Sequence, residues 1–168
     1  TWGLWGQFEP VVPRERRVEV RERVLADGSV CTAIDPEEVK ARACELLTLG
    51  VEAVAVTFIN AYANGENERV AAEAIRSVWP NAYVNISSDI LPEIREFERA
   101  STTALNAYLQ PVVADYLDRL ASELGEQSFD GQLLIVQSNG GVMTVETAKA
   151  MPVRTALSGP AAGVIAAA

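Results

Sequence analysis

The amino-acid sequence predicts an α/β fold: a mixed sheet with flanking helices. Two short runs, residues 53–59 and 133–136, are almost continuously apolar, which is typical of strands covered on both faces. Between and around these runs, apolar residues recur at helical spacing. The chain has 168 residues, of which 49% are hydrophobic and 22% charged, so we expect a single α/β piece over residues 1–168.

The first half of the chain contains three predicted units. Residues 16–33 favour a β-hairpin, because valines flank a turn centred on Asp27-Gly28. A helix is expected to begin at Asp35, which can cap it, with Pro36 in the first turn, and to end at Gly50.

Residues 53–86 predict a strand, a helix and a second strand, that is, a βαβ unit. The strands are expected at 53–59 and 82–86. The segment Asn64-Gly65-Glu66 is expected to open the helix between them, and Pro80 follows its end.

The second half is predicted to begin with a helical pair over residues 93–125. Pro111 lies in the middle of the apolar periodicity and is expected to separate helices near 93–109 and 111–124. Residues 132–168 then form a strand–turn segment and a final helix. That segment holds the strand at 133–136, a short helix at 144–150, a short strand at 153–157 and a helix that begins at Ser158.

Composition excludes several classes of function. The chain contains no histidine, so a Ser-His-Asp or Cys-His catalytic set cannot form within it, and no histidine-ligated metal site is expected. A net charge of −9 disfavours nucleic-acid binding. No apolar run approaches the roughly 20 residues of a membrane helix. With only two cysteines, a cytoplasmic setting is expected.

The first candidate site is the turn Ser138-Asn139-Gly140-Gly141. Glycines permit positive φ and let a ligand approach bare backbone N–H groups, and the asparagine amide can hold a ribose, a phosphate oxygen or a water. In an open α/β sheet, ligands bind beyond the carboxyl ends of the strands. The same residues also suit a turn with no ligand, and the string alone leaves both interpretations open.

The second candidate is the segment Ser158-Gly159-Pro160. Serine suits a helix N-cap, proline suits the first turn, and a helix N-terminus attracts anions. The segment is neither a Walker A loop nor a G-x-G-x-x-G fingerprint, so a purely structural helix start remains the alternative. A third candidate is Arg99, for which a surface or interdomain salt bridge is the expected role.

Five stretches, taken in their order along the chain, resemble the hydantoinase A / 5-oxoprolinase family. They are RVEVRERVLADGSV, GVEAVAVTFINAYANGENE, LPEIREFERASTTALNAYLQPVVADYLDRL, LLIVQSNGGVMT and PVRTALSGPAAGVIAAA. The resemblance covers nearly the whole chain, from about Val11 to Ala168. The family includes N-methylhydantoinases, 5-oxoprolinases and acetone carboxylase β subunits.

The resemblance implies a ribonuclease-H-like lobe of the actin-like ATPase superfamily, with nucleotide in the cleft between two lobes. It implies an ATP- and Mg²⁺-dependent enzyme that opens hydantoin or 5-oxoproline-type rings after carbonyl phosphorylation. On this basis Asn139, Gly140, Gly141, Ser158 and Gly159 are expected to contact the nucleotide. Arg99 and Ser138 are expected to support the substrate site or the lobe interface.

The resemblance also implies that the chain is an internal fragment. The family's two glycine-rich phosphate loops are expected before Thr1 and after Ala168, so no catalytic residue can be named and no cofactor or metal is expected to bind here. The expected partners are the remaining lobes of the same polypeptide, a B-type hydantoinase subunit and a small cyclic amide. The apolar start, Trp2, Leu4, Trp5 and Phe8, is expected to pack on the missing lobe.

Two other functions fit the same resemblance. One is an acetone carboxylase-type β subunit, which uses the same scaffold to carboxylate a ketone. The other is a non-catalytic scaffold domain of the same fold. Nothing in these 168 residues separates them from a cyclic-amide hydrolase.

Overall fold

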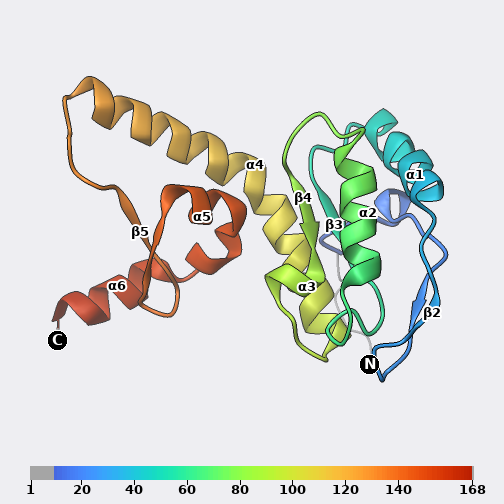
Figure 1. The fold of residues 1–168 in the computed structure, drawn as a ribbon. Helices are drawn as coiled ribbons and strands as arrows, with labels where there is room; N and C mark the ends of the chain where they lie inside the picture. Colours follow the sequence, from blue (N-terminus) through green and yellow to red (C-terminus); the bar gives the residue numbers. More distant parts are fainter. Residues whose placement is uncertain (1–9, 168) are drawn as a thin grey trace, which may run out of the picture. The chain divides into compact units, whose positions relative to one another are not determined.

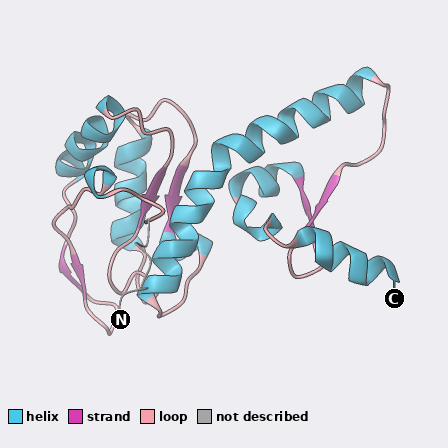
Figure 2. Cartoon of the chain, turned by 180° about the vertical axis from the view of Figure 1, so that it is seen from behind, coloured by secondary structure: helices cyan, strands magenta, loops and turns pink. Residues whose placement is uncertain are grey.

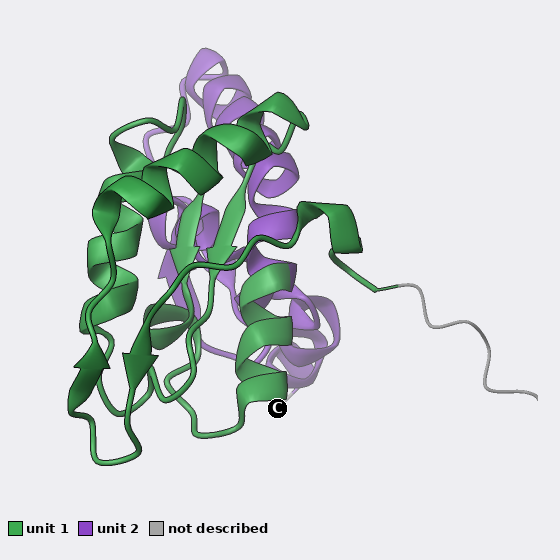
Figure 3. Cartoon of the chain, turned by 90° about the vertical axis from the view of Figure 1, so that its right-hand side faces the viewer, with its two compact units in different colours: residues 1–104 green, residues 105–168 purple. Residues whose placement is uncertain are grey.

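The computed structural model of the chain describes residues 10–167, so the apolar start at Trp2–Phe8 lies outside the described residues. The chain divides into two compact units, residues 1–104 and residues 105–168, which Figure 3 shows in different colours. One long helix, α4 (Glu96–Glu126), contributes residues to both units. Each unit has its own core, and each is described separately below.

A parallel pair of strands forms the centre of unit 1. Strand β3 (Val54–Val56) pairs with β4 (Val84–Ile86) in the register Val54↔Val84, and helix α2 (Glu66–Arg76) connects them (Figure 1). This arrangement confirms the predicted βαβ unit. Helix α1 (Pro36–Thr48) packs against α2.

The core of unit 1 comes from one face of each of these elements. Its buried residues are Ile34, Val39, Ala43, Leu46, Val54, Val56, Ala71, Ala72, Ala74, Ile75, Trp79, Val84 and Ile86. Alanines dominate the α2 contribution, and their small side chains let the helix lie close to the strands.

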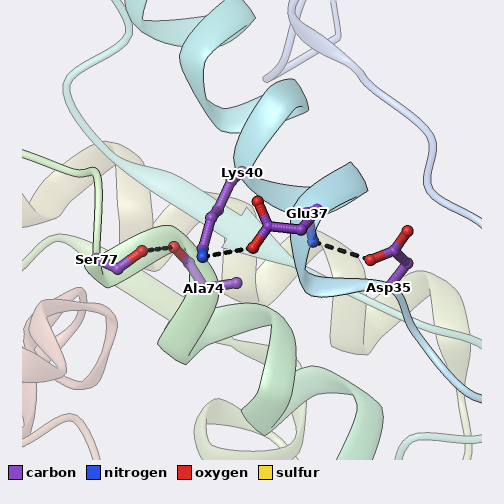
Figure 4. Close-up of polar contacts among 5 residues, drawn as sticks. All are labelled: Asp35, Glu37, Lys40, Ala74 and Ser77. Atoms are coloured by element: carbon purple, nitrogen blue, oxygen red, sulfur yellow. Dashed lines mark hydrogen bonds and ion pairs between the residues drawn. The ribbon is translucent and has the colours of Figure 1, made fainter.

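Local signals set both ends of α1. The Asp35 carboxylate accepts a hydrogen bond from the Glu37 N–H at 3.0 Å, and Lys40 pairs with Glu37 at 2.7 Å (Figure 4). At the other end Gly50 has φ +69°, and its N–H donates to the Leu47 carbonyl. Because glycine adopts this left-handed conformation without steric cost, the helix ends where the sequence predicts.

The predicted hairpin at residues 16–33 is present, but its paired part is short. Strand β1 (Arg23–Val24) pairs antiparallel with β2 (Val30–Thr32), while Arg14–Arg16 forms a 3₁₀ turn, η1. The turn between the strands places Gly28 at φ +83°. There the Asp27 carboxylate accepts hydrogen bonds from the Ser29 hydroxyl and N–H, which lower the pKa of Asp27.

Three asparagines that follow β3 hold this hairpin in place. Each donates its side-chain N–H to a backbone carbonyl of the hairpin segment. The bonds run from Asn60 to Val24 (3.0 Å), from Asn64 to Gly28 (2.9 Å) and from Asn67 to Thr32 (3.2 Å). The hairpin is therefore anchored by residues 35 or 36 positions further along the chain.

Helix α4 continues through Pro111, so the expected break into two helices is wrong. A proline inside a helix removes one backbone hydrogen bond at a cost of about 3 kcal/mol. Here Asn106 and Gln110 before the proline, and Ala114 and Leu117 after it, are all buried. Packing on both sides of the proline holds a single helix in spite of that cost.

The rest of unit 2 is a hairpin and three short helical segments. Strand β5 (Leu134–Val136) pairs antiparallel with β6 (Val142–Thr144). They are followed by α5 (Val145–Ala150), η2 (Pro152–Thr155) and α6 (Ser158–Ala167). The predicted short helix and final helix are confirmed.

Three expectations for the strands need correction. Residues 153–157 were expected to form a strand, but Pro152 begins a 3₁₀ turn, in which the Thr155 hydroxyl donates to the Pro152 carbonyl at 2.7 Å. Strand β5 was expected to be covered on both faces, yet Leu134 is exposed. Among the described residues, the strands form three separate pairs and not one mixed sheet (Figure 2).

Candidate functional site

Ser138 brings the two predicted turn motifs together within unit 2. Its hydroxyl donates to the Arg154 carbonyl at 2.8 Å and accepts from the Leu157 N–H at 3.0 Å. Its own N–H donates to the same Arg154 carbonyl at 2.7 Å. The β5–β6 turn is therefore hydrogen-bonded to Leu157, the residue immediately before α6. Ser158, the first residue of α6, comes next in the chain.

The β5–β6 turn itself is closed by hydrogen bonds between its own residues. The Gln137 N–H donates to the Gly141 carbonyl at 2.8 Å, and the Gly140 N–H donates to the Gln137 carbonyl at 3.0 Å. The Asn139 carboxamide oxygen accepts from the Gly141 N–H at 2.9 Å. Gly140 has φ +87°, a conformation that glycine adopts readily. Asn139 and Gly140 thus have structural roles in the turn.

The glycines of the two motifs differ in the space around them. A Cβ on Gly140 would lie 2.6 Å from Cδ1 of Ile165, so the end of that side chain would have to move to admit it. A Cβ on Gly141 would lie 3.2 Å from the Asn139 carboxamide oxygen. A Cβ on Gly159 or Gly163 would meet no heavy atom within 4 Å apart from its own helix backbone and chain neighbours. The open positions are therefore on α6 and not in the hairpin turn.

These residues do not fit a complete nucleotide–magnesium site. No group of three or more Asp, Glu, Cys or His residues in the described part of the chain could hold a metal ion. The polar side chains of Ser138 and Asn139 are already engaged in intrachain hydrogen bonds. The first turn of α6, with Ser158 half-exposed and Gly159 exposed, leaves space beside its backbone.

Arg99 belongs to unit 1 and is completely buried, so a surface salt bridge is wrong, and the expected interdomain salt bridge stays a prediction. Its guanidinium donates to the Glu93 carbonyl at 2.8 Å and to the Phe58 carbonyl at 2.7 Å. The same group lies over the Tyr62 ring, 5.8 Å from its centroid, within the range of a cation–π interaction. These contacts give Arg99 a structural role at the start of α4.

Glu68 is a buried residue that the sequence analysis did not single out. It has no exposed surface, although it lies on the apolar stripe of α2. Its carboxylate accepts from the Phe58 N–H at 2.9 Å, the Ser87 hydroxyl at 2.6 Å and the Ser88 N–H at 2.8 Å. The sequence did contain a signal for this burial. Glu68 lies three residues before Ala71 and seven before Ile75, so its carboxylate falls on the apolar stripe of the helix.

Glu68 and Arg99 bind the backbone of the same residue, Phe58. The Phe58 N–H donates to Glu68, and the Phe58 carbonyl accepts from Arg99. Phe58 follows β3, and Ser87 and Ser88 follow β4. Ser87 and Ser88 begin a short helix, α3 (Ser87–Ile90). The buried pair therefore fixes the segments at the carboxyl ends of both parallel strands, the edge where α/β proteins place their ligands.

Two family models match the chain, one on each side of residue 90. The model described as "Hydantoinase/oxoprolinase N-terminal region" matches residues 4–79, and "Hydantoinase/oxoprolinase" matches residues 99–168. The chain belongs to the hydantoinase/oxoprolinase family.

Two curated relatives show how much of a family protein the chain covers. Caprolactamase subunit alpha of Pseudomonas jessenii is 32% identical over 151 residues, which are 90% of this chain and 22% of that protein. The 5-oxoprolinase of Saccharomyces cerevisiae is 32% identical over 120 residues, or 71% of this chain and 9% of that protein. The chain spans less than a quarter of the length of these relatives.

Solved structures match the fold over nearly the whole chain. The ATP-dependent caprolactamase of Pseudomonas jessenii matches with a TM-score of 0.83 at 29% identity, over 98% of this chain and 24% of that one. A nucleotide-free structure of acetone carboxylase matches with a TM-score of 0.81 at 24% identity, over 95% of this chain and 23% of that one.

None of the helices in the described part of the chain combines the length and the apolar character that a membrane crossing requires.

Proposed function

We propose that this chain is a segment of an ATP-dependent enzyme that opens small cyclic amides, of the hydantoin, 5-oxoproline or lactam type. The observation that carries the proposal is the similarity to the P. jessenii caprolactamase, at 32% sequence identity and with a TM-score of 0.83. We further propose that the chain contributes part of a ribonuclease-H-like lobe of the actin-like ATPase kind. The parallel β3–α2–β4 unit supports that assignment.

Within this enzyme we assign unit 2 to one wall of the nucleotide cleft. The first turn of α6, with Ser158 and Gly159, would face the ligand, because no side chain occupies the space beside Gly159. Ser138 would position that turn through its bond to the Leu157 N–H. Asn139, Gly140 and Gly141 would shape the neighbouring hairpin turn. Arg99 would fix the start of α4 without touching the ligand.

ATP and Mg²⁺ would be held mainly by parts of the longer protein, since the described residues offer no metal-ligand cluster. ATP supplies the phosphoryl group that activates the amide carbonyl in such an enzyme. A B-type subunit is the proposed protein partner, in keeping with caprolactamase, whose matched chain is a subunit alpha.

The decisive test is turnover by the longer family protein that carries this segment. With a B-type subunit present, we expect ATP hydrolysis that depends on hydantoin, 5-oxoproline or caprolactam, measured by phosphate release. The 168-residue chain alone should release no phosphate above a no-protein blank. ATP-dependent carboxylation of a ketone without lactam opening would instead assign the carboxylase function. If no substrate gives ATP turnover, the non-catalytic scaffold domain is the function that remains.

Gly159 provides a sharper test of the proposed wall. Gly159→Ala should not disturb the fold, because its Cβ would meet nothing within 4 Å. If a nucleotide approaches this backbone, the variant should lose turnover in the longer protein by about tenfold or more, equivalent to about 1.4 kcal/mol. Gly163→Ala, further along the same helix and equally open, is the matched control. Equal turnover for both variants would remove Gly159 from the site.

A further inference from the structure

In unit 2, helix α4 buries a polar face. Asn106 has no exposed surface. Its amide N–H donates to the Ala150 carbonyl at 3.0 Å, and its carboxamide oxygen accepts from the Val153 N–H at 3.1 Å. Gln110 also donates to the Ala150 carbonyl, at 3.4 Å. Polar side chains thus fasten α4 to the segment after α5.

The opposite face of α4 is apolar and exposed. Leu105, Tyr108, Val112 and Tyr116 follow one another at intervals of three or four residues, so they line one side of the helix. Tyr108 is 70% exposed and Val112 is 71% exposed. We name these four residues the α4 apolar face. The inward side of the helix holds Ala107, Ala114 and Leu117 beside the two amides, so apolar residues lie on both sides of this helix, whereas a surface helix ordinarily turns a polar side to water.

We propose that another apolar element of the same polypeptide packs on the α4 apolar face. That element would belong to the longer family protein of the proposed function. This inference rests on that proposed function in one respect, that the chain is a segment of a longer protein. The chain corresponds to 22% of the length of caprolactamase subunit alpha, so more than three quarters of such a protein is available to cover the face.

The size of the face favours this occupant over a second copy of the chain. From Leu105 to Tyr116 the helix rises by about 17 Å, at about 1.5 Å per residue. A stable dimer interface buries about 800 Å² and 20–30 residues on each partner, far more than four side chains on one helix. One further helix laid at an interaxial distance of about 8–10 Å would cover them.

An ion pair lies at the edge of the α4 apolar face and indicates what kind of side chains its occupant presents. Asp115 and Arg119 form an ion pair at 2.8 Å on the exposed side of the helix, next to Tyr116. Their charges satisfy each other, so they offer little to a charged partner. The occupant is therefore expected to present aliphatic or aromatic side chains, with polar residues only at its rim.

Cysteine labelling tests the proposal without any use of enzyme activity. Cys31 and Cys44 are exposed, so both are first replaced by serine. Val112→Cys is then compared with Glu123→Cys, an exposed position on the same helix and thus the matched control. In the 168-residue chain, a maleimide should label both at similar rates. In the longer protein, labelling of Val112→Cys should slow by about tenfold or more while Glu123→Cys is unchanged.

Three results would overturn the proposal. The first is labelling of Val112→Cys at the control rate in the longer protein. The second is protection in the 168-residue chain that increases with its concentration, which would assign the face to a second copy. The third is protection that appears only when a separate subunit is added. The longer protein can also show slow labelling of Val112→Cys without any amide-dependent ATP turnover. That result would support this proposal and reject the proposed function, so the two can fail independently.

Discussion

At the scale of single residues, Glu68 is the most constrained polar group of unit 1. It is fully buried, and three donors from the loop after β3 and from the start of α3 converge on its carboxylate. A carboxylate only accepts hydrogen bonds, so it suits this environment, whereas the amide group of glutamine adds two donors.

We therefore expect Glu68→Gln to lower the free energy of unfolding by about 1–3 kcal/mol, because one of the three donors loses its acceptor. Urea denaturation followed by circular dichroism measures this change. Glu73→Gln, at an exposed position of the same helix, is the control and should change the stability by less than about 0.5 kcal/mol. Equal effects from the two variants would contradict the role assigned to Glu68.

Gly140 is the residue on which the β5–β6 turn most depends. Gly140→Ala should destabilise the chain by about 1–2 kcal/mol from the left-handed backbone alone, and contact with Ile165 adds to the loss. Gly163→Ala should instead raise the stability by about 0.5–1 kcal/mol, because alanine favours a helix and has free space there. Thermal unfolding of both variants is the measurement, and the same sign for both would contradict the geometry.

At the scale of elements, Pro111 sets up a test of how α4 is held together. Pro111→Ala restores a backbone donor in mid-helix, and we expect it to raise the free energy of unfolding by about 2 kcal/mol, after allowance for the greater freedom of the unfolded chain. Ser122→Ala, at an exposed position of the same helix, should change little. A destabilised Pro111→Ala variant would show that α4 requires the shape that proline imposes.

The elements also show which features the sequence could predict. Helix α1 was predictable because Asp35 and Gly50 act on their immediate neighbours. The unbroken α4 was not, because Asn106 and Gln110 are held by Ala150, about 40 residues away. The burial of Arg99 was not predictable for the same reason, because its partner Phe58 lies 41 residues away, whereas the position of Glu68 on the apolar stripe of α2 did indicate burial. The turn after β5 and the start of α6 at Ser158 were predictable, but the strand expected before Ser158 is a 3₁₀ turn, and the hydrogen-bond partners of both motifs were not evident from spacing.

At the scale of the whole molecule, the chain has two cores. The core of unit 1 is built on β3, β4, α1 and α2, whereas unit 2 has a small cluster of Leu117, Met143 and Ala148. The smaller cluster buries less apolar surface, so unit 2 is expected to open at a lower free energy than unit 1.

Hydrogen exchange can test this separation. Gly140→Ala should accelerate exchange at the amides of β5 and β6 and leave those of Val54–Val56 unchanged. Mass spectrometry of the exchanged protein, after digestion into peptides from each unit, gives the comparison. Equal acceleration in both units would show that the chain unfolds as a single cooperative body.

The asparagine anchors of the β1–β2 hairpin have a consequence for the order of folding. Two-stranded ribbons of this length do not persist alone in water, and their anchors at Asn60, Asn64 and Asn67 come later in the chain. The hairpin is synthesised before the βαβ unit and must therefore wait for that unit before it acquires its final shape. Pulse labelling during refolding should accordingly protect the amides of β3 and α2 before those of β1 and β2.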